Sequence, residues 1–257
     1  MTDETLLLIG RETPHGREVM ETHARRLRDR AAVETVRVVT YESDPERELR
    51  GAIDTGTADR AFAIPMVAAH TRETETDVPR ALRGLDAAVE YVDPVGRSPA
   101  VTEALADRAR AALAPAGDTS IILAGFGSSS LPYQRRTAEY HAERLLAETD
   151  YDEVEPSFLL QNPAMECARY TVSNDRVVAV PLFFAHGPAT RERIPEELDI
   201  DRGGIAYAEP LGDHPRLTDV LHGALEKRRV LAESSDATPA AGTASNPVAT
   251  DGDGRAR

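Results

Sequence analysis

The chain has 257 residues, which is enough to bury one large hydrophobic core or two ordinary ones. It has 44 acidic and 30 basic side chains, for a formal net charge of −14, and this sign of charge argues against nucleic acid as a partner. Cys167 is the only cysteine, which excludes an internal disulfide and a thiolate-rich zinc or iron–sulfur site within one chain.

Hydropathy and composition also indicate where the protein works. No apolar run approaches the roughly 18 residues that a membrane span needs. The acidic N-terminus passes directly into an apolar run and does not resemble a secretory signal. We therefore expect a cytoplasmic protein with no membrane partner. Lys227 is the only lysine, and an acidic, lysine-poor chain is typical of a halophilic cytoplasm; GC-rich codon usage is the alternative cause of the arginine bias.

The first half of the chain alternates short apolar runs with amphipathic segments. The predicted strands are residues 6–9, 36–41, 61–67 and 89–92. The predicted helices cover residues 17–30, a segment opened by Asp44-Pro45, 76–85 and 99–113. Strands that alternate with helices of this length predict a parallel sheet with helices on both faces.

The second half repeats this order after a linker at residues 114–118. Its predicted strands are residues 120–124, 154–160, 177–184 and 205–208, and its predicted helices are residues 133–148, 164–171, 191–198 and 215–231. Residues 233–257 have little to bury and are expected to be a disordered tail. The predicted fold class is therefore α/β, with two tandem similar domains at residues 1–114 and 119–232, each a four-stranded, mainly parallel sheet.

The halves also share residues at a fixed spacing. At an offset of 116 residues, identical residues recur, among them Pro65/Pro181, Ala69/Ala185, His70/His186, Thr74/Thr190 and Pro79/Pro195. Upstream the offset is 118, and there His23 matches His141. A repeat of this length is too long for a solenoid unit and has the size of a small domain. We expect a duplicated chain with two lobes about a pseudo-twofold axis, either monomeric or assembled further into a homodimer.

Two histidines stand at equivalent strand ends, where open parallel sheets bind ligands. If the halves face each other across a cleft, His70 and His186 converge on one ligand. Two imidazoles with a carboxylate nearby, such as Glu73, suit a divalent first-row metal. The alternative is that each histidine caps the following helix or satisfies a buried carbonyl. His23 and His141 lie in mid-helix beside the apolar face and are expected to be structural.

Further candidates flank the same strand ends. The turn 126–130 follows a strand and precedes a helix, so its N–H groups are placed to receive an anion. Arginines beside these turns would receive the carboxylates of an acidic ligand or lie on solvated surface: Arg72, Arg135, Arg136, Arg191 and Arg193. His214 leads into the last helix and is open to either interpretation, whereas His15 is expected to face solvent.

Three motifs together resemble one known family. They are the strand–Gly–turn–helix openings at 6–10 and 121–128, the VPLFF…RIP segment at 180–195, and PLGDHP at 210–215. The chain is similar to the class II tetrapyrrole chelatases, the family of sirohydrochlorin cobaltochelatases and ferrochelatases. This resemblance implies two four-stranded α/β domains that close on sirohydrochlorin, with a divalent metal, Co²⁺ or Fe²⁺, as substrate and no tightly bound cofactor. Histidine serves in that family as metal ligand and proton acceptor.

This chain departs from the family pattern at the histidines themselves. The pattern has one His directly after the first-strand Gly and a second His six residues before the Pro of the RIP-like triplet. The first position is Arg11 or Phe126 here, and the second is Glu73 or Ala189. We therefore expect His70 and His186, three residues earlier, to serve as the metal ligands. The expected roles are these: His70, His186 and Glu73 as catalytic residues, and Arg11, Arg72, Phe126, Ser128, Ser129, Arg191 and His214 as substrate contacts.

The sequence leaves two functions open. The first is an enzyme, a sirohydrochlorin chelatase (a lyase) that inserts cobalt or iron in the biosynthesis of cobalamin or siroheme. The second is a non-catalytic relative that binds a tetrapyrrole or a metal as a carrier, a partner subunit or a sensor. Loss of all four family histidine positions motivates the second function.

Overall fold

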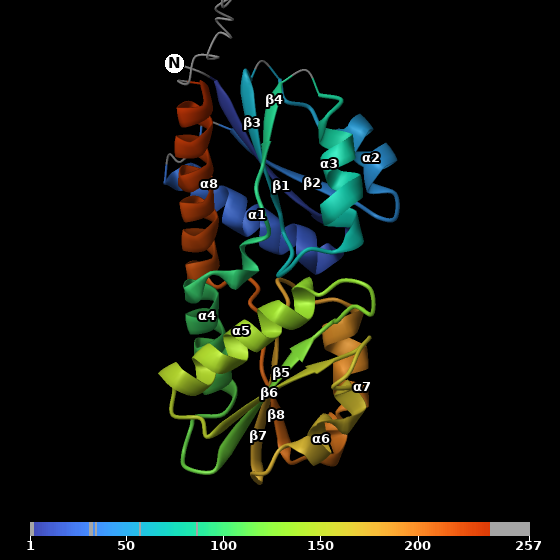
Figure 1. The fold of residues 1–257 in the computed structure, drawn as a ribbon, viewed down its shortest axis with the longest axis vertical. Helices are drawn as coiled ribbons and strands as arrows, with labels where there is room; N and C mark the ends of the chain where they lie inside the picture. Colours follow the sequence, from blue (N-terminus) through green and yellow to red (C-terminus); the bar gives the residue numbers. More distant parts are fainter. Residues whose placement is uncertain (1–2, 31–32, 34, 57, 86, 237–257) are drawn as a thin grey trace, which may run out of the picture.

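The computed structural model describes residues 3–30, 33, 35–56, 58–85 and 87–236, which form two α/β lobes stacked along the long axis of the molecule (Figure 1). In the first lobe, four parallel strands lie in the order β2-β1-β3-β4. In the second, the order β6-β5-β7-β8 repeats that topology, again all parallel. This confirms the predicted fold class and the duplication of its architecture.

The strands form where apolar runs are long enough to be covered on both faces. Leu6, Leu7 and Leu8 in β1 are all fully buried, although they point alternately to opposite faces of the sheet. The strand bounds are β1 (Glu4–Arg11), β2 (Thr35–Tyr41), β3 (Arg60–Pro65), β4 (Ala88–Tyr91), β5 (Thr119–Gly125), β6 (Glu153–Phe158), β7 (Arg176–Pro181) and β8 (Ile205–Tyr207).

The helices begin at capping residues or prolines. Thr13 accepts a hydrogen bond from the Gly16 N–H at the start of α1, and Asp44 accepts one from Arg47 at the start of α2. The α-helix bounds are α1 (Pro14–Asp29), α2 (Pro45–Ala52), α3 (Val78–Leu82), α4 (Pro99–Ala112), α5 (Tyr133–Glu148), α6 (Ala168–Thr171), α7 (Ile194–Glu197) and α8 (Pro215–Asp236). Short 3-10 turns are η2 (Val95–Arg97), η3 (Met165–Cys167) and η5 (Ile200–Arg202). The helix predicted at 164–171 is therefore a 3-10 turn followed by the short α6.

The last helix of each sequence repeat packs on the other repeat. Helix α8 lies against α1 and β3 of the first lobe, whereas α4 lies against β7 and α5 of the second (Figure 1). One continuous apolar core results, and it runs from Leu6 and Phe62 in the first lobe to Val178 and Val180 in the second. The lobes in space therefore differ from the sequence repeats 1–114 and 119–232 by an exchange of two helices.

Two buried histidines join the exchanged helices to their new neighbours. His141 Nε2 donates to the Gly96 carbonyl (2.5 Å), and its Nδ1 accepts from the Thr102 hydroxyl (2.8 Å). His23 repeats this arrangement with the Gly212 carbonyl (3.0 Å) and Thr218 (2.8 Å). Both rings are fully buried, in agreement with their predicted structural role.

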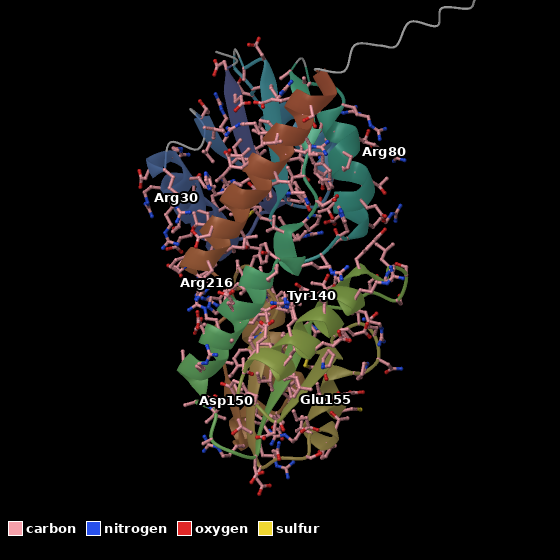
Figure 2. The ribbon with its side chains drawn as sticks, turned by 60° about the vertical axis from the view of Figure 1, so that its left-hand side comes forward. Arg30, Arg80, Tyr140, Asp150, Glu155 and Arg216 are labelled. Carbon is pink, nitrogen blue, oxygen red and sulfur yellow. The ribbon has the colours of Figure 1, made fainter. Side chains whose placement is uncertain are left out.

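Polar contacts also bridge the repeats at this junction, near Arg216 and Tyr140 in Figure 2. Arg216 at the start of α8 donates to Asp107 of α4 (3.2 Å). The Arg97 guanidinium lies 5.2 Å from the centre of the Tyr140 ring. The junction thus combines a continuous core with cross-repeat ion pairs and ring contacts.

Two helices begin earlier than predicted, as π-helical turns. These turns are η1 (Glu73–Asp77) and η4 (Ala189–Arg193), before α3 and α7. The physical reason lies in the prolines that follow. Pro79 has no N–H for an α-helical bond to the residue four positions back. The turn before it is wider, and the Val78 N–H bonds to the Glu73 carbonyl.

The C-terminal helix is longer than predicted. Helix α8 continues to Asp236, so residues 233–236, which were expected to be disordered, are helical. Ala232 is buried, and the α8 side chains Arg229 and Arg228 pair with Glu4 and Glu90, each at 2.7 Å. These contacts hold the end of the helix against the first lobe. The rest of the predicted tail, 237–257, lies outside the described residues. Over the described ranges, no helix combines the length and the apolar character needed to cross a bilayer.

Candidate functional site

A cavity of about 300 Å³ lies between the lobes. Its walls come from the carboxyl ends of β1, β3, β5 and β7, so both sheets contribute the edge at which parallel sheets bind ligands. The strand ends contribute Gly10 and Arg11, Met66 and Val67, Gly125 and Phe126, and Leu182 to Gly187; the starts of α1 and α5 close the remaining sides. Most of this lining is apolar, with a few charged groups.

The polar wall belongs to the first lobe. Arg11 forms an ion pair with Glu73, and its Nη1 donates to the Glu42 carbonyl (2.8 Å). The Tyr41 hydroxyl donates to the other Glu73 oxygen (3.1 Å). Burial, together with the Glu73 charge, raises the pKa of Tyr41 well above its usual value, so the phenol stays neutral. The two positions at which the chelatase pattern has histidine thus hold an arginine–carboxylate pair here.

The second lobe presents an aromatic wall at the equivalent place. Phe126 lines the cavity with 38% of its surface exposed, and it packs edge-on against Phe183 with ring centres 6.5 Å apart. Ala189, at the other pattern position, has no polar group. The duplicated architecture therefore encloses a chemically unequal space, charged on one side and aromatic on the other.

His186 lines this cavity and has one ring nitrogen to spare. Its Nε2 donates to Glu209 Oε2 at 2.5 Å, which fixes the proton on that nitrogen. Its Nδ1 is buried and has no hydrogen-bond partner among the described residues. The His186 ring also lies edge-on to His15 of α1, with ring centres 6.0 Å apart. An imidazole lone pair is thus available beside the cavity.

His70 is placed differently, although it is the repeat equivalent of His186. It is absent from the described lining of the cavity. Both of its nitrogens have partners at 3.3 Å, Nδ1 with Thr74 Oγ1 and Nε2 with Asp93, and its ring packs edge-on against Tyr133 (5.6 Å). The sequence analysis expected His70 and His186 to converge on one ligand, but only His186 is in the described lining of the cavity. Each histidine instead packs against the first turn of a helix in the opposite lobe: His70 against α5 and His186 against α1.

The remaining predicted contacts divide between the rim and sites away from the cavity. Arg191 donates to His15 Nε2 at 2.7 Å. The Ser128 hydroxyl accepts from the Leu131 N–H, so it caps its own turn. His214 lies between α4 and α8, 3.5 Å from Asp107, and burial lowers its pKa. Arg72, Ser128, Ser129 and His214 are all absent from the described lining.

Sequence reasoning missed Tyr133 and Glu209, and it favoured solvent over a ligand as the surroundings of His15. His15 and Tyr133 occupy equivalent positions at the start of α1 and α5, and Glu209 is the equivalent of Asp93. These pairs are not identical, so a search for identical residues passes over them. The signal was present in the repeat alignment, because each of these positions is polar in both halves.

Metal ions would find few ligands in one place. Among the residues that the structure describes, no group of three or more His, Cys, Asp and Glu side chains is arranged to hold a metal ion. At His186, the neighbouring side chains of these types are His15 and Glu209. Such a sparse donor set fits a metal that is exchanged as a substrate better than one that is bound permanently.

Sequence and structure comparisons place the chain among known proteins. A family model described as CbiX matches residues 5–112 and again 120–228. A protein named "Probable sirohydrochlorin cobaltochelatase" from Halobacterium salinarum is 23% identical over 262 residues, which cover 85% of this chain and 89% of that protein. The sirohydrochlorin cobaltochelatase of Methanopyrus kandleri is 30% identical over 132 residues, 91% of its own length but 40% of this chain.

A solved structure has the same fold. The sirohydrochlorin chelatase SirB from Bacillus subtilis subspecies spizizenii, in complex with cobalt, superposes with a TM-score of 0.70 at 16% identity, covering 91% of this chain and 98% of that chain. The two matches to the family model fall on the two repeats found in the sequence and together cover most of the described residues. The chain therefore belongs to the CbiX family, with one copy of the family domain in each half.

Proposed function

We propose that this protein is a sirohydrochlorin chelatase that inserts a divalent metal, cobalt or iron, into the tetrapyrrole within the cavity between its lobes. One observation carries the proposal: the carboxyl ends of both parallel sheets enclose a largely apolar cavity that His186 lines, with one ring nitrogen of that histidine unpartnered. Family membership and the similarity to proteins named as cobaltochelatases support it.

The walls suit the two substrates in different ways. The aromatic wall at Phe126 matches the apolar face of a macrocycle, whereas Arg11 is the cation in the lining that would receive its carboxylates. In the reaction, two pyrrole N–H bonds break, metal–nitrogen bonds form, and two protons leave. His186 Nδ1 is the group placed to bind the incoming metal or receive a proton, and Glu73 is the nearby carboxylate that can pass a proton to solvent.

The proposal keeps four of the residues suggested by the sequence as lining: His186, Glu73, Arg11 and Phe126. Arg191 is outside the described lining and donates to His15, whose ring packs against His186. His70, Arg72, Ser128, Ser129 and His214 are outside it, since none is in the described lining. Both lobes of one chain enclose the site, so the proposed chemistry needs no second copy.

The direct test follows the absorbance of sirohydrochlorin after anaerobic addition of Co²⁺ or Fe²⁺. The proposal predicts that the purified protein accelerates metal insertion over the same mixture without protein. A rate equal to that of the protein-free mixture for both metals would overturn the proposed activity. The metal that gives the higher kcat/KM then identifies whether the product belongs to cobalamin or siroheme biosynthesis.

A second candidate function is a tetrapyrrole- or metal-binding protein without catalysis. The observation that favours it is the Arg11–Glu73 ion pair, which occupies the first-lobe positions of the pattern histidines, with Phe126 and Ala189 in the second lobe. Saturable binding of sirohydrochlorin with no acceleration of metal insertion would select this function. The same absorbance titration therefore distinguishes the two candidates.

We also propose a high-salt cytoplasm as the place of action. The excess of acidic residues and the single lysine support this proposal, since screening by salt reduces the repulsion among carboxylates. Metal insertion by the purified protein should then be faster in molar KCl than in dilute buffer. A rate that falls as KCl is added would contradict this part of the proposal.

A further inference from the structure

We infer that the incoming divalent metal is first held by His15 and His186, one imidazole from each lobe, at the rim of the cavity. This inference rests on the proposed function for the reason why a metal arrives there. It assigns the metal to neither of the pattern positions, nor to the pair His70 and His186 that the sequence suggested.

The argument begins with two clusters that the pseudo-twofold relates. We call the group His70, Glu75, Asp93 and Tyr133 the phenol junction, and the group His186, Arg191, Glu209 and His15 the imidazole junction. Each residue of one group is the repeat equivalent of a residue in the other. Each junction joins the first turn of a helix in one lobe to a strand end and a π-helical turn in the opposite lobe.

The phenol junction has no imidazole nitrogen without a partner. The Tyr133 hydroxyl donates to Glu75 at 2.6 Å, and this hydrogen bond raises the pKa of the phenol. Both nitrogens of His70 lie within hydrogen-bond distance of partners. This junction is therefore a satisfied contact between the lobes.

The imidazole junction is built in the manner of a metal-ligating histidine. The Glu209 carboxylate accepts the Nε2 proton of His186 at 2.5 Å, so the lone pair of His186 is on Nδ1, the buried nitrogen with no partner. A carboxylate behind a histidine in this way orients the ring and increases the basicity of its other nitrogen. His186 thus presents the correct tautomer before any metal is bound.

His15 provides the second nitrogen. Its Nε2 accepts a hydrogen bond from Arg191, which can only donate, so Nε2 also has a lone pair. Two imidazole nitrogens on one metal lie within about 4 Å of each other, since each bond is about 2.1 Å. The two ring centres are 6.0 Å apart at an interplanar angle of 79°, so the inference requires the side chains to rotate until the two nitrogens reach that spacing.

Arg191 occupies the place of a cation in the metal-free protein. Its guanidinium is directed at the lone pair that a metal would use, so the metal replaces one positive charge with another. Two protein ligands leave the other coordination positions of the metal to water and then to pyrrole nitrogens. This satisfies the requirement that a substrate metal be held loosely enough to leave.

The test measures Co²⁺ binding by calorimetry and by the visible absorbance of bound Co²⁺, with no tetrapyrrole present. Wild-type protein should bind one Co²⁺ per chain. His15→Ala and His186→Ala should each lower the affinity by at least about tenfold. Arg191→Leu should raise it by about thirtyfold, because a single positive charge about 4 Å from a divalent ion in water costs roughly 2 kcal/mol. His222→Ala, a change at a partly exposed histidine of α8, is the control and should leave the affinity unchanged.

Several results would overturn the inference. They are no Co²⁺ binding by the wild type, unchanged affinity in His15→Ala, or a loss of affinity in Arg191→Leu. Misfolding of a variant cannot produce the gain expected for Arg191→Leu, so the inference stays falsifiable. The test is also separate from the proposed function. If the variants change Co²⁺ affinity as expected but the protein inserts no metal, the proposed activity is wrong and the metal site remains. If the protein inserts metal but the variants do not change Co²⁺ affinity, the metal site is wrong and the proposed activity remains.

Discussion

At the scale of single residues, one methylene group separates two equivalent carboxylates. Glu209 lies 2.5 Å from the Nε2 of His186, whereas the shorter Asp93 lies 3.3 Å from the Nε2 of His70. Of these two histidines, His186 keeps a buried nitrogen with no partner among the described residues, and His70 does not. The two copies of the histidine have therefore diverged through their neighbours, and the difference between them is one of hydrogen bonding rather than of identity.

This divergence predicts unequal effects of removing the two carboxylates. Glu209→Ala should lower Co²⁺ affinity and the rate of metal insertion by about tenfold, because His186 loses the group that fixes its orientation and proton. Asp93→Ala is the matched variant at the equivalent position and should change neither quantity. Calorimetric titration and the insertion assay give the two readouts. Equal effects of the two substitutions would show that Glu209 does not position His186.

At the scale of elements, the exchange of α4 and α8 makes each lobe depend on the other half of the chain. His141 of α5 contacts Gly96 and Thr102 from the first repeat, and His23 of α1 contacts Gly212 and Thr218 from the second. Gly96 has no room for a side chain, since a Cβ there would lie 1.8 Å from the Ala68 carbonyl oxygen. The two lobes are consequently expected to unfold together.

The buried histidines predict how stability depends on pH. Burial lowers the pKa of His141 from 6.5 to about 4 and also lowers the pKa of His23. Between pH 6.5 and pH 4 His141 is protonated in the unfolded chain but neutral in the folded protein. Its contribution to the free energy of unfolding is therefore fully present above pH 6.5 and is lost as the pH falls toward 4. His141 alone accounts for a loss of about 3 kcal/mol in the free energy of unfolding between neutral pH and pH values below 4.

The measurement is the thermal midpoint of unfolding from pH 7 to pH 4. In the wild type it should fall across this range, and His141→Asn should make the fall shallower whatever its effect at pH 7. His222→Asn, at a partly exposed histidine of α8, should leave the slope unchanged. A slope that His141→Asn does not alter would contradict the account of the buried ring.

At the scale of the whole molecule, charge is the dominant property. A net charge of −14 favours the expanded chain through repulsion, and salt weakens that repulsion as the screening length shortens from about 10 Å at 0.1 M to about 3 Å at 1 M. Exposed arginine–carboxylate pairs stabilise the folded chain and are weakened by salt, but each contributes at most about 1 kcal/mol.

We therefore expect the free energy of unfolding to rise with KCl. The midpoint of urea denaturation should move to higher urea between 0.1 M and 1 M KCl, roughly the range over which the screening length falls. A midpoint that is constant or lower at 1 M would mean that ion pairs outweigh net repulsion in this protein.

The sequence predicted the layers of the molecule better than its contacts. Short apolar runs that alternate with amphipathic segments favour covered strands, so both sheets could be predicted, although β7 ends at Pro181 and not at residue 184. The repeat located the strand ends that line the cavity. Sequence separation does not say which lobe a helix covers, so the exchange of α4 and α8 could not be predicted. The contacts of His186 with His15 and of His70 with Tyr133 also join opposite lobes, so the sequence could not predict them either.

The most direct test of the account compares metal insertion by wild type, His186→Ala and His70→Ala in one anaerobic absorbance assay. His186 lines the cavity with a free nitrogen, whereas the nitrogens of His70 are engaged outside it. The account predicts that His186→Ala reduces the rate to that of the protein-free mixture and that His70→Ala retains most of the wild-type rate. Wild-type turnover by His186→Ala, or equal loss in both variants, would contradict it.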